Sequence, residues 1–291
     1  MPQLRLELLP PSSGCAVSAA RERLIVRFAT CVADAGTGLM KVAVVLKSSQ
    51  EIEKMRRAGK VVREVLELVR SHVKPGATTL DLERVAEARI AELGAKPAFK
   101  GYHGFPCVLC TSVNSEVVHG IPSKKRVLKE GDIVSVDCGA IVDGYYGDAA
   151  ITVPVGKNIA PDTARLLAVT EKSLHAGISA VKPGATLGDI GAAVQGVVEA
   201  EGFSVVRDFV GHGIGAHMHE DPQVPNFGLA GQGMKLRAGM VIAIEPMVNA
   251  GKPEVRVLRD GWTAVTDDGS MSAHFEHTVA VTDTGAKVLT E

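Results

Sequence analysis

The sequence predicts an α+β fold in which two copies of one helix–helix–strand unit pack about a pseudo-twofold axis. The hexamer VKPGAT occurs at 73–78 and again at 181–186, which is 108 residues later. The strand-like segments LKEGDIVSVD, which begins at Leu128, and LRAGMVIAIE, which begins at Leu236, keep the same offset. Several anchors at one offset are typical of a duplicated unit. We therefore expect an antiparallel sheet covered by two helix pairs.

Each hexamer is expected to join two helices. Apolar residues recur at helical spacing in 52–72, and the segment 163–180 before the second hexamer has the same character. In both copies Pro-Gly ends the first helix, and a Thr with a nearby Asp begins the second one, over 78–94 and 186–202.

Composition bounds the class of protein. The chain has 291 residues, 46% of them hydrophobic and 22% charged, which is enough to bury a sizeable core. The 32 basic and 33 acidic residues leave a net charge of -1, so no general basic field attracts nucleic acid or membrane. No segment is long and apolar enough to span a bilayer, and the five cysteines form an odd set. We expect a cytoplasmic monomer without a membrane partner or a direct nucleic-acid site.

The N-terminal region differs from the rest of the chain. It contains the turn-rich stretch LLPPSSG and no periodicity long enough for a confident element. We expect residues 1–47 to be a disordered leader or the product of a start codon assigned too far upstream. The compact domain would then cover 48–291, as two repeats of about 48–157 and 158–291.

The first repeat ends in a predicted hairpin that brings two carboxylates together. Asp143 and Gly144 form a strong two-residue turn signal between alternating apolar segments. With this turn Asp137 pairs with residue 150, and Asp148 lies on the same face two residues away. Two neighbouring carboxylates repel each other on a strand face, and a divalent cation removes that repulsion.

The second repeat adds three further candidates. Glu245 and Glu276 each interrupt an apolar strand pattern, and His212 lies between glycines in GHGIG. With Asp137 and Asp148 they make four carboxylates and one imidazole. This donor set suits two divalent ions such as Mn, Fe, Co or Zn, and differs from the Cys-rich set of a structural zinc site.

Other motifs have two readings. An isolated Asp is more often a turn or cap residue. His119, beside a proline, reads from composition as a surface-loop histidine, whereas a short glycine loop could direct His212 and His219 toward one cavity. The CVLC motif at 107–110 could bind zinc or exchange disulfides, but its β-branched, apolar context favours a strand.

Six ordered motifs resemble one family. YHGFP, NSEVVHGIP, SVDCGAIVDGYYGD, GHGIGAHMHEDPQVPN, IEPMV and FEHTV together are similar to the type I methionine aminopeptidases of peptidase family M24, over residues of about 48 to 291. The resemblance implies the duplicated pita-bread fold of that family. It also implies removal of the initiator methionine from new proteins whose second residue is small.

The resemblance assigns roles to individual residues. Asp148 and Glu276 would bridge two divalent ions, and a hydroxide held between the ions would attack the scissile carbonyl. The implied metal ligands are Asp137, Asp148, His212, Glu245 and Glu276. His119 and His219 would be catalytic and would face the substrate, which replaces the surface-loop reading of His119. Glu245 would also handle a proton.

The resemblance further implies a methionine pocket and a partner. The pocket residues would be Tyr102, Phe105, Cys110 and Trp262, a lining suited to a thioether. Phe99 stands where a smaller cysteine is common in the family, and Met218 where an aromatic residue is common. The substrates would be N-termini of nascent chains, met at the ribosome.

Two alternatives stay open. One is a prolidase or Xaa-Pro aminopeptidase of the same fold, although such enzymes usually carry a long folded N-terminal domain. The other is an inactive pita-bread protein that binds protein or RNA, although it should have lost metal ligands that are all present here. Glu245 and Glu276 are only 31 positions apart, which leaves little room for the subdomain that type II enzymes insert.

Overall fold

The computed structural model describes residues 44–291. The leader predicted for 1–47 therefore lies outside the described residues, except for its last four. Residues 44–291 lie within one compact unit, as their internal contacts show. Within residues 44–291, no helix has the length and apolar character needed to cross a membrane.

Four helices occur where the sequence predicts them, as two consecutive pairs. They are α1 (Ser49–His72), α2 (Thr79–Glu92), α3 (Pro161–Ser179) and α4 (Leu187–Ala200). A capping box begins the second helix of each pair: Thr78 with Asp81 in α2, and Thr186 with Asp189 in α4. The second helices of the two pairs therefore begin in the same way, as expected for a duplicated unit.

The VKPGAT hexamer has the same contacts in both repeats. Gly76 donates its backbone N–H to the carbonyl of Leu128, and Gly184 donates to that of Leu236, at 2.8 and 3.0 Å. Both glycines have a φ near +85°, which a residue with a side chain rarely adopts. Each hexamer thus ties its helix pair to the segment that leads into the repeat's own strand.

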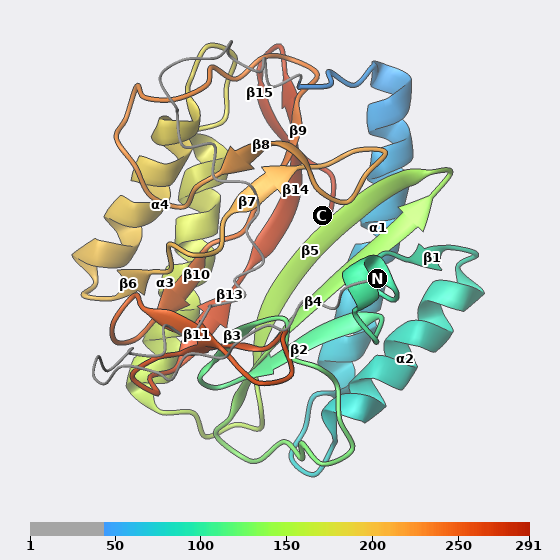
Figure 1. Cartoon of the computed structure of the whole chain (residues 1–291), viewed down its shortest axis with the longest axis vertical. Coiled ribbons are helices and arrows are strands. Elements are labelled where there is room, and N and C mark those ends of the chain that lie inside the picture. The colour runs from blue at the N-terminus through green and yellow to red at the C-terminus, as the bar shows by residue number, and fades with distance from the viewer. Residues whose placement is uncertain (1–43) are drawn as a thin grey trace, which may run out of the picture. The chain divides into compact units, whose positions relative to one another are not determined.

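The main sheet has nine strands, all paired antiparallel, and seven of them follow the order β1-β4-β5-β14-β9-β7-β8. In addition, β2 pairs with β4 and β15 pairs with β14. The bounds are β1 (Lys96–Pro97), β2 (Leu109–Val113), β4 (Ile133–Val142), β5 (Tyr145–Pro154), β7 (Gly211–Gly213), β8 (Glu220–Val224), β9 (Val241–Ile244), β14 (Glu276–Thr282) and β15 (Gly285–Val288). Figure 1 shows the long β4–β5 hairpin beside β14, which joins the two repeats at the centre of the sheet.

The predicted hairpin register is confirmed. Val142 pairs with Tyr145, and Asp137 pairs with Ala150. Asp143 has a φ of 51° at the turn, a left-handed conformation that Asp tolerates better than most residues.

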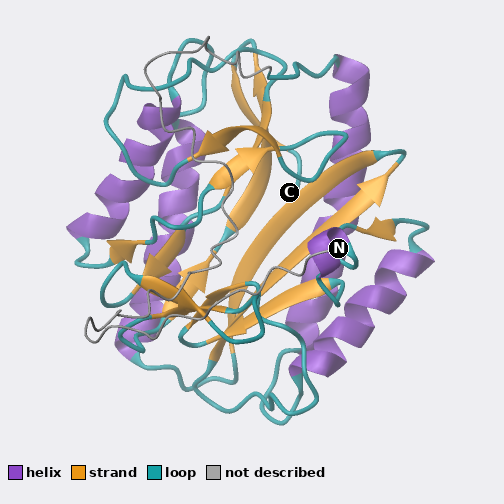
Figure 2. Cartoon of the chain, viewed as in Figure 1, coloured by secondary structure: helices purple, strands orange, loops and turns teal. Residues whose placement is uncertain are grey.

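The helices pack on one face of the sheet. Gly147 of β5 contacts α1 so closely that an added Cβ would lie 2.7 Å from the backbone nitrogen of Gly59. In the second repeat, Ile244 of β9 packs among the core residues beside α3 and α4. Side chains alternate along a strand, so Asp148 and Glu245, each next to one of these strand residues, point to the opposite face. In Figure 2 the two helix pairs lie at the left and right of the view, with the strands between them.

Two strands of the second repeat change sheets part-way along. β9 continues after Glu245-Pro246 as β10 (Met247–Asn249), and β13 (Ser272–His274) continues after Phe275 as β14. β10 and β13 pair with each other in a smaller sheet completed by β6 (Ser204–Val205). The remaining sheet is formed by β3 (Glu116–Val118), β11 (Val255–Val257) and β12 (Ala264–Thr266).

Candidate metal centre and active site

The five predicted ligands come from five neighbouring strands. In sheet order they are Asp137 on β4, Asp148 on β5, Glu276 at the start of β14, Glu245 directly after β9, and His212 on β7. The first two belong to the first repeat and the other three to the second. The site is therefore assembled across the junction of the two repeats.

The strand register explains why these side chains share a face. Ala150 pairs with Asp137 on one side and with Glu276 on the other. Asp148 lies two residues before Ala150, hence on the same face. On β9, Ala243 occupies a position of that face and pairs with Thr278. The positions between the carboxylates thus carry small side chains.

His212 presents one ring nitrogen to the carboxylates. Its Nδ1 lies 2.9 Å from the carbonyl of Gly213, which can only accept, so Nδ1 carries the proton. Nε2 then has a free lone pair and lies 3.5 Å from Oε1 of Glu245 and 3.9 Å from Oδ2 of Asp148. Ligand atoms of Asp148, His212 and Glu276 all lie within 4.8 Å of one another.

Burial and mutual repulsion disfavour negative charge on the four acids. Burial raises the pKa of Asp137 to about 7. Burial, together with the charges of neighbouring acids, raises the pKa of Asp148, Glu245 and Glu276 well above their ordinary values. One oxygen each of Asp137, Asp148 and Glu276 is buried without a hydrogen-bond partner. Such orphaned oxygens beside an unprotonated imidazole nitrogen fit the donor set of a divalent cation.

The two further histidines lie next to other residues of the candidate site. The His219 ring is 4.3 Å from that of His212, centre to centre, and its Nδ1 lies 2.7 Å from the Tyr102 hydroxyl. His119 follows β3 and is half-buried, with its ring 5.6 Å from that of Phe209 and 6.5 Å from that of Trp262. Burial lowers the pKa of His119 to about 4, so its imidazole is neutral at physiological pH.

The predicted pocket residues form one apolar cluster beside the ligands. Cys110 on β2 pairs directly with Asp137 on β4. The ring of Phe105 is 5.1 Å from that of Trp262, at an interplanar angle of 74°. The cluster contains Phe99, Tyr102, Phe105, Cys110, Met218 and Trp262, together with Ala98, Cys107, Ile121, Ile141 and Tyr146. Phe99 packs over Gly139, where an added Cβ would lie 2.7 Å from the phenyl ring.

Comparison with known proteins identifies the family. Residues 53–283 match the profile of "Metallopeptidase family M24". The chain belongs to metallopeptidase family M24. Within this family, the chain is 53% identical to the methionine aminopeptidase of Clostridium acetobutylicum over 247 aligned residues. The alignment covers 85% of this chain and 98% of the relative.

Solved structures of the M24 family have the same fold. The methionine aminopeptidase of Thermotoga maritima superposes with a TM-score of 0.84 at 51% identity, over 86% of this chain and all of the other. The prolidase of Pyrococcus horikoshii gives a TM-score of 0.69 at 23% identity, over 85% of this chain and 63% of the other, a likeness of fold alone. The predicted α+β pita-bread fold and the resemblance to methionine aminopeptidases are confirmed.

Sequence reasoning missed several residues around this M24 site. Glu83 on α2 is buried and accepts hydrogen bonds from the backbone N–H groups of Val108 and Leu109, which fixes the start of β2 beside Cys110. The available signal was an acid on the apolar face of a predicted helix. Lys47 forms a buried ion pair with Glu220, and no sequence pattern indicates that contact.

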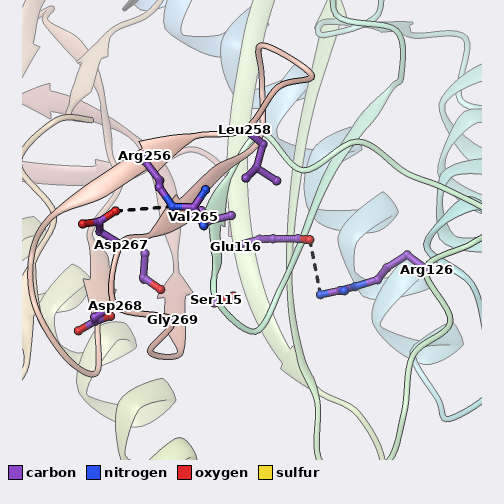
Figure 3. Close-up of a pocket in the computed structure, with 10 residues that line it drawn as sticks. Ser115, Glu116, Arg126, Arg256, Leu258, Val265, Asp267, Asp268 and Gly269 are labelled. Atoms are coloured by element: carbon purple, nitrogen blue, oxygen red, sulfur yellow. Dashed lines mark ion pairs between the residues drawn. The ribbon is translucent and has the colours of Figure 1, made fainter. Parts of the chain in front are cut away.

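A hollow of about 520 Å³ lies on the sheet formed by β3, β11 and β12. Figure 3 shows its rim, where Arg126 pairs with Glu116 and Arg256 pairs with Asp267. None of the five predicted ligands and none of the predicted pocket residues lines it. It is thus separate from the candidate active site.

Proposed function

We propose that this M24 enzyme removes the initiator methionine from new polypeptides whose second residue is small, with divalent metal ions as cofactors. Relatives that are about half identical in sequence to this chain, over nearly their whole length, are named methionine aminopeptidases. The observation that carries the proposal is the pairing of Cys110 with Asp137, which joins an apolar pocket to the ligand cluster. An N-terminal side chain in that pocket would have its amine and its first peptide bond beside the cluster.

Two divalent ions fit the ligand arrangement best. Asp148 and Glu276 occupy the middle of the five-strand series, between Asp137 on one side and Glu245 with His212 on the other. The ions would be held by all five residues, with the carboxylates of Asp148 and Glu276 at the centre of the set. Bound ions of this kind polarise a carbonyl and provide a nucleophile from water at neutral pH. Co, Mn, Fe and Zn all suit oxygen-rich sites with one imidazole.

The chain's own residues bind and orient the peptide. The neutral imidazoles of His119 and His219 can hydrogen-bond the reacting amide and the oxygen on which charge develops. The Tyr102 hydroxyl, bonded to Nδ1 of His219, constrains the orientation of that ring. Glu245, at the edge of the carboxylate cluster, is assigned to carry a proton toward the departing amine.

The methionine side chain is assigned to the aromatic pocket. Tyr102, Phe105 and Trp262 provide ring faces and edges, and sulfur–aromatic contacts favour a thioether. Burial raises the pKa of the Cys110 thiol, which keeps it neutral and apolar in character. Met218 and Phe99 are buried members of the same cluster.

We assign catalysis to 48–291, as repeats of about 48–157 and 158–291. The proposed leader, expected over 1–47, is shortened at its end, because Lys47 is buried against the second repeat and pairs with Glu220. Nascent chains at the ribosome are the proposed substrates, and a cytoplasmic monomer is the proposed form.

A peptide panel tests the proposal against its nearest rival. The purified chain with Mn²⁺, Fe²⁺ or Co²⁺ should release methionine from Met-Ala-Ser and leave Met-Leu-Ser largely intact. Ala-Pro and Ala-Pro-Ala test for cleavage beside proline. Hydrolysis of the proline peptides alone would assign the chain to the Xaa-Pro enzymes, and no hydrolysis of any peptide with any metal would indicate an inactive pita-bread protein.

A further inference from the structure

We propose that His274 is a positioning residue, whose Nε2–H donates a hydrogen bond to Oε2 of Glu245 and so fixes that carboxylate within the ligand cluster. The inference rests on the proposed function, because it gives His274 a role in the metal site assigned above. Sequence reasoning assigned His274 no role. Four observations support a role for His274: its strand register, its distance from Glu245, the hydrogen bonds that hold its backbone, and the contrast with His277.

The register directs His274 toward the ligands. His274 ends β13, two residues before Glu276, so both side chains lie on the same face. Met247 pairs with His274, and Ile244 pairs with His277. Both pairs fit one continuous antiparallel register, although each strand is interrupted between them. In that register Glu245 lies opposite Glu276 and diagonal to His274. Diagonal neighbours on one face are within reach of long side chains.

The distances place the Glu245 carboxylate between two imidazoles. Its Oε1 lies 3.5 Å from Nε2 of His212, and its Oε2 lies 3.9 Å from Nε2 of His274. Nε2 of His274 is completely buried and has no hydrogen-bond partner. A separation of 3.9 Å exceeds a hydrogen bond by about 1 Å, which a rotation of the carboxylate closes.

A hydroxyl from the other repeat holds the His274 backbone. Thr152 on β5 donates its hydroxyl hydrogen to the His274 carbonyl at 2.7 Å and accepts the His274 N–H at 2.9 Å. Ser135 on β4 bonds the same hydroxyl at 2.9 Å. The clamp occurs where β13 is not part of the main sheet, so the side chain of Thr152 replaces a missing backbone ladder. His274 is thus fixed against a strand of the first repeat.

His277 is a nearby histidine that does not face the ligand cluster. It is three residues along the same segment, on the opposite face of β14, and its Nδ1 lies 2.8 Å from the Thr290 hydroxyl. It is half-buried and points away from the ligands. His277 therefore serves as a matched control for replacing a histidine in this part of the sheet.

A hydrogen bond behind a ligating carboxylate has measurable consequences. It selects one orientation of the carboxylate and leaves the other oxygen free for the cation, and loss of such a bond typically costs about 10- to 100-fold in metal affinity or activity. Because the bond orients a ligand and does not touch the peptide, its loss should lower kcat and leave KM for the substrate nearly unchanged.

The test compares four full-length variants. His274→Leu and His274→Met remove the donor, and Met also adapts to irregular core space in case Leu prevents folding. His274→Gln keeps an N–H donor on a side chain of similar reach, and His277→Gln is the control. Mn²⁺ affinity is measured by isothermal titration calorimetry on chelator-treated protein, beside kcat and KM for Met-Ala-Ser.

We expect Mn²⁺ affinity and kcat to fall by about 10-fold or more in the Leu and Met variants. His274→Gln should recover most of the loss, and His277→Gln should match the wild type. Unchanged affinity in the folded Leu or Met variant, or a Gln variant as impaired as Leu, would overturn the proposal. Loss of one bound ion outright would also overturn it, because His274 would then be a ligand. The affinity measurement needs no turnover, so it stands even if the peptide substrate is wrong.

Discussion

Asp137 and Glu276 face the same residue, Ala150, from the two strands on either side of it. One belongs to the first repeat and the other to the second, so this pairing is where the two halves make a common site. Without a cation the arrangement places buried carboxylates side by side, which burial and mutual repulsion oppose. The metal-free fold is therefore destabilised at this cluster, and a bound cation would remove the destabilisation.

The metal-free protein should lose stability as pH rises above about 6.5. Burial raises the folded-state pKa of Asp137 to about 7, and burial with the charges of neighbouring acids raises those of Asp148, Glu245 and Glu276 well above their ordinary values. The folded state therefore holds protons that the unfolded chain releases near pH 4, and stability falls as pH rises through this window. Between about pH 4 and 6.5 the buried histidines, such as His212 with its pKa lowered to about 4, add an opposite slope.

Above about pH 7 buried histidines such as His212 are neutral in the folded state and largely neutral in the unfolded chain, so they no longer oppose the carboxyl effect. Melting temperatures at pH 6.5, 7.5 and 8.5 in chelator should decline, and the increase produced by saturating Mn²⁺ should grow over the same range. A metal-free melting temperature that stays level or rises from pH 6.5 to 8.5 would contradict the assigned acids.

Asp148→Asn should abolish metal binding and yet stabilise the metal-free fold. The amide keeps the shape of the side chain but carries no charge, so it no longer repels Asp137 and Glu276. Mn²⁺ affinity should fall beyond the roughly 10- to 100-fold that loss of a residue behind a ligand costs. Asp143→Asn, at the exposed turn of the same hairpin, is the control and should leave affinity unchanged. If both variants bind Mn²⁺ like the wild type, Asp148 is not a ligand.

His119→Ala should lower turnover without removing metal. His119 lies beside Phe209 and Trp262 and is assigned to the substrate amide, not to the metal, so kcat should fall by about 100-fold or more. Metal content, measured by elemental analysis, should match the wild type. His217→Ala, an exposed histidine of another loop at the site, is the control. Loss of metal from the His119 variant would mean that its role is misassigned.

The buried Lys47–Glu220 pair should stabilise the loop that carries His219. Lys47 Nζ lies 2.5 Å from Oε2 of Glu220, and Oε1 of Glu220 accepts the backbone N–H of His217. Lys47→Met or Glu220→Gln alone leaves a buried charge unpaired, so each should cost about 3 kcal/mol in the free energy of unfolding.

The double variant of this pair should be less destabilised than the two single effects combined, and urea denaturation measures the coupling. The matched control is the exposed Arg57–Asp143 pair, for which single changes should cost less than about 1 kcal/mol. Equal effects at the two pairs would show that the Lys47 contact is no more than a surface ion pair.

Much of this architecture follows from local patterns. The hexamer repeat, the helix caps and the Asp143-Gly144 turn each act over a few residues, and together they predict both helix pairs and the register that sets Asp137 opposite Ala150. Local sequence patterns do not predict the pairing of β5 with β14. It joins residues more than 120 positions apart, and no local propensity specifies which strand meets which.

The parts of the site that sequence reasoning missed are all long-range. His274 faces Glu245 only because two strands change sheets at Pro246 and Phe275. Glu83 accepts two backbone hydrogen bonds from a segment 25 residues away. The surface-loop reading of His119 shows the same limit, because its half-buried place beside Phe209 and Trp262 depends on strands from the other repeat.

Metal removal and return, followed by hydrolysis of Met-Ala-Ser, tests the central claim most directly. Protein dialysed against a strong chelator should release no methionine, and addition of Mn²⁺, Fe²⁺ or Co²⁺ should restore release as two ions bind per chain. Full activity in the presence of the chelator would contradict the claim that these five residues hold the catalytic metals.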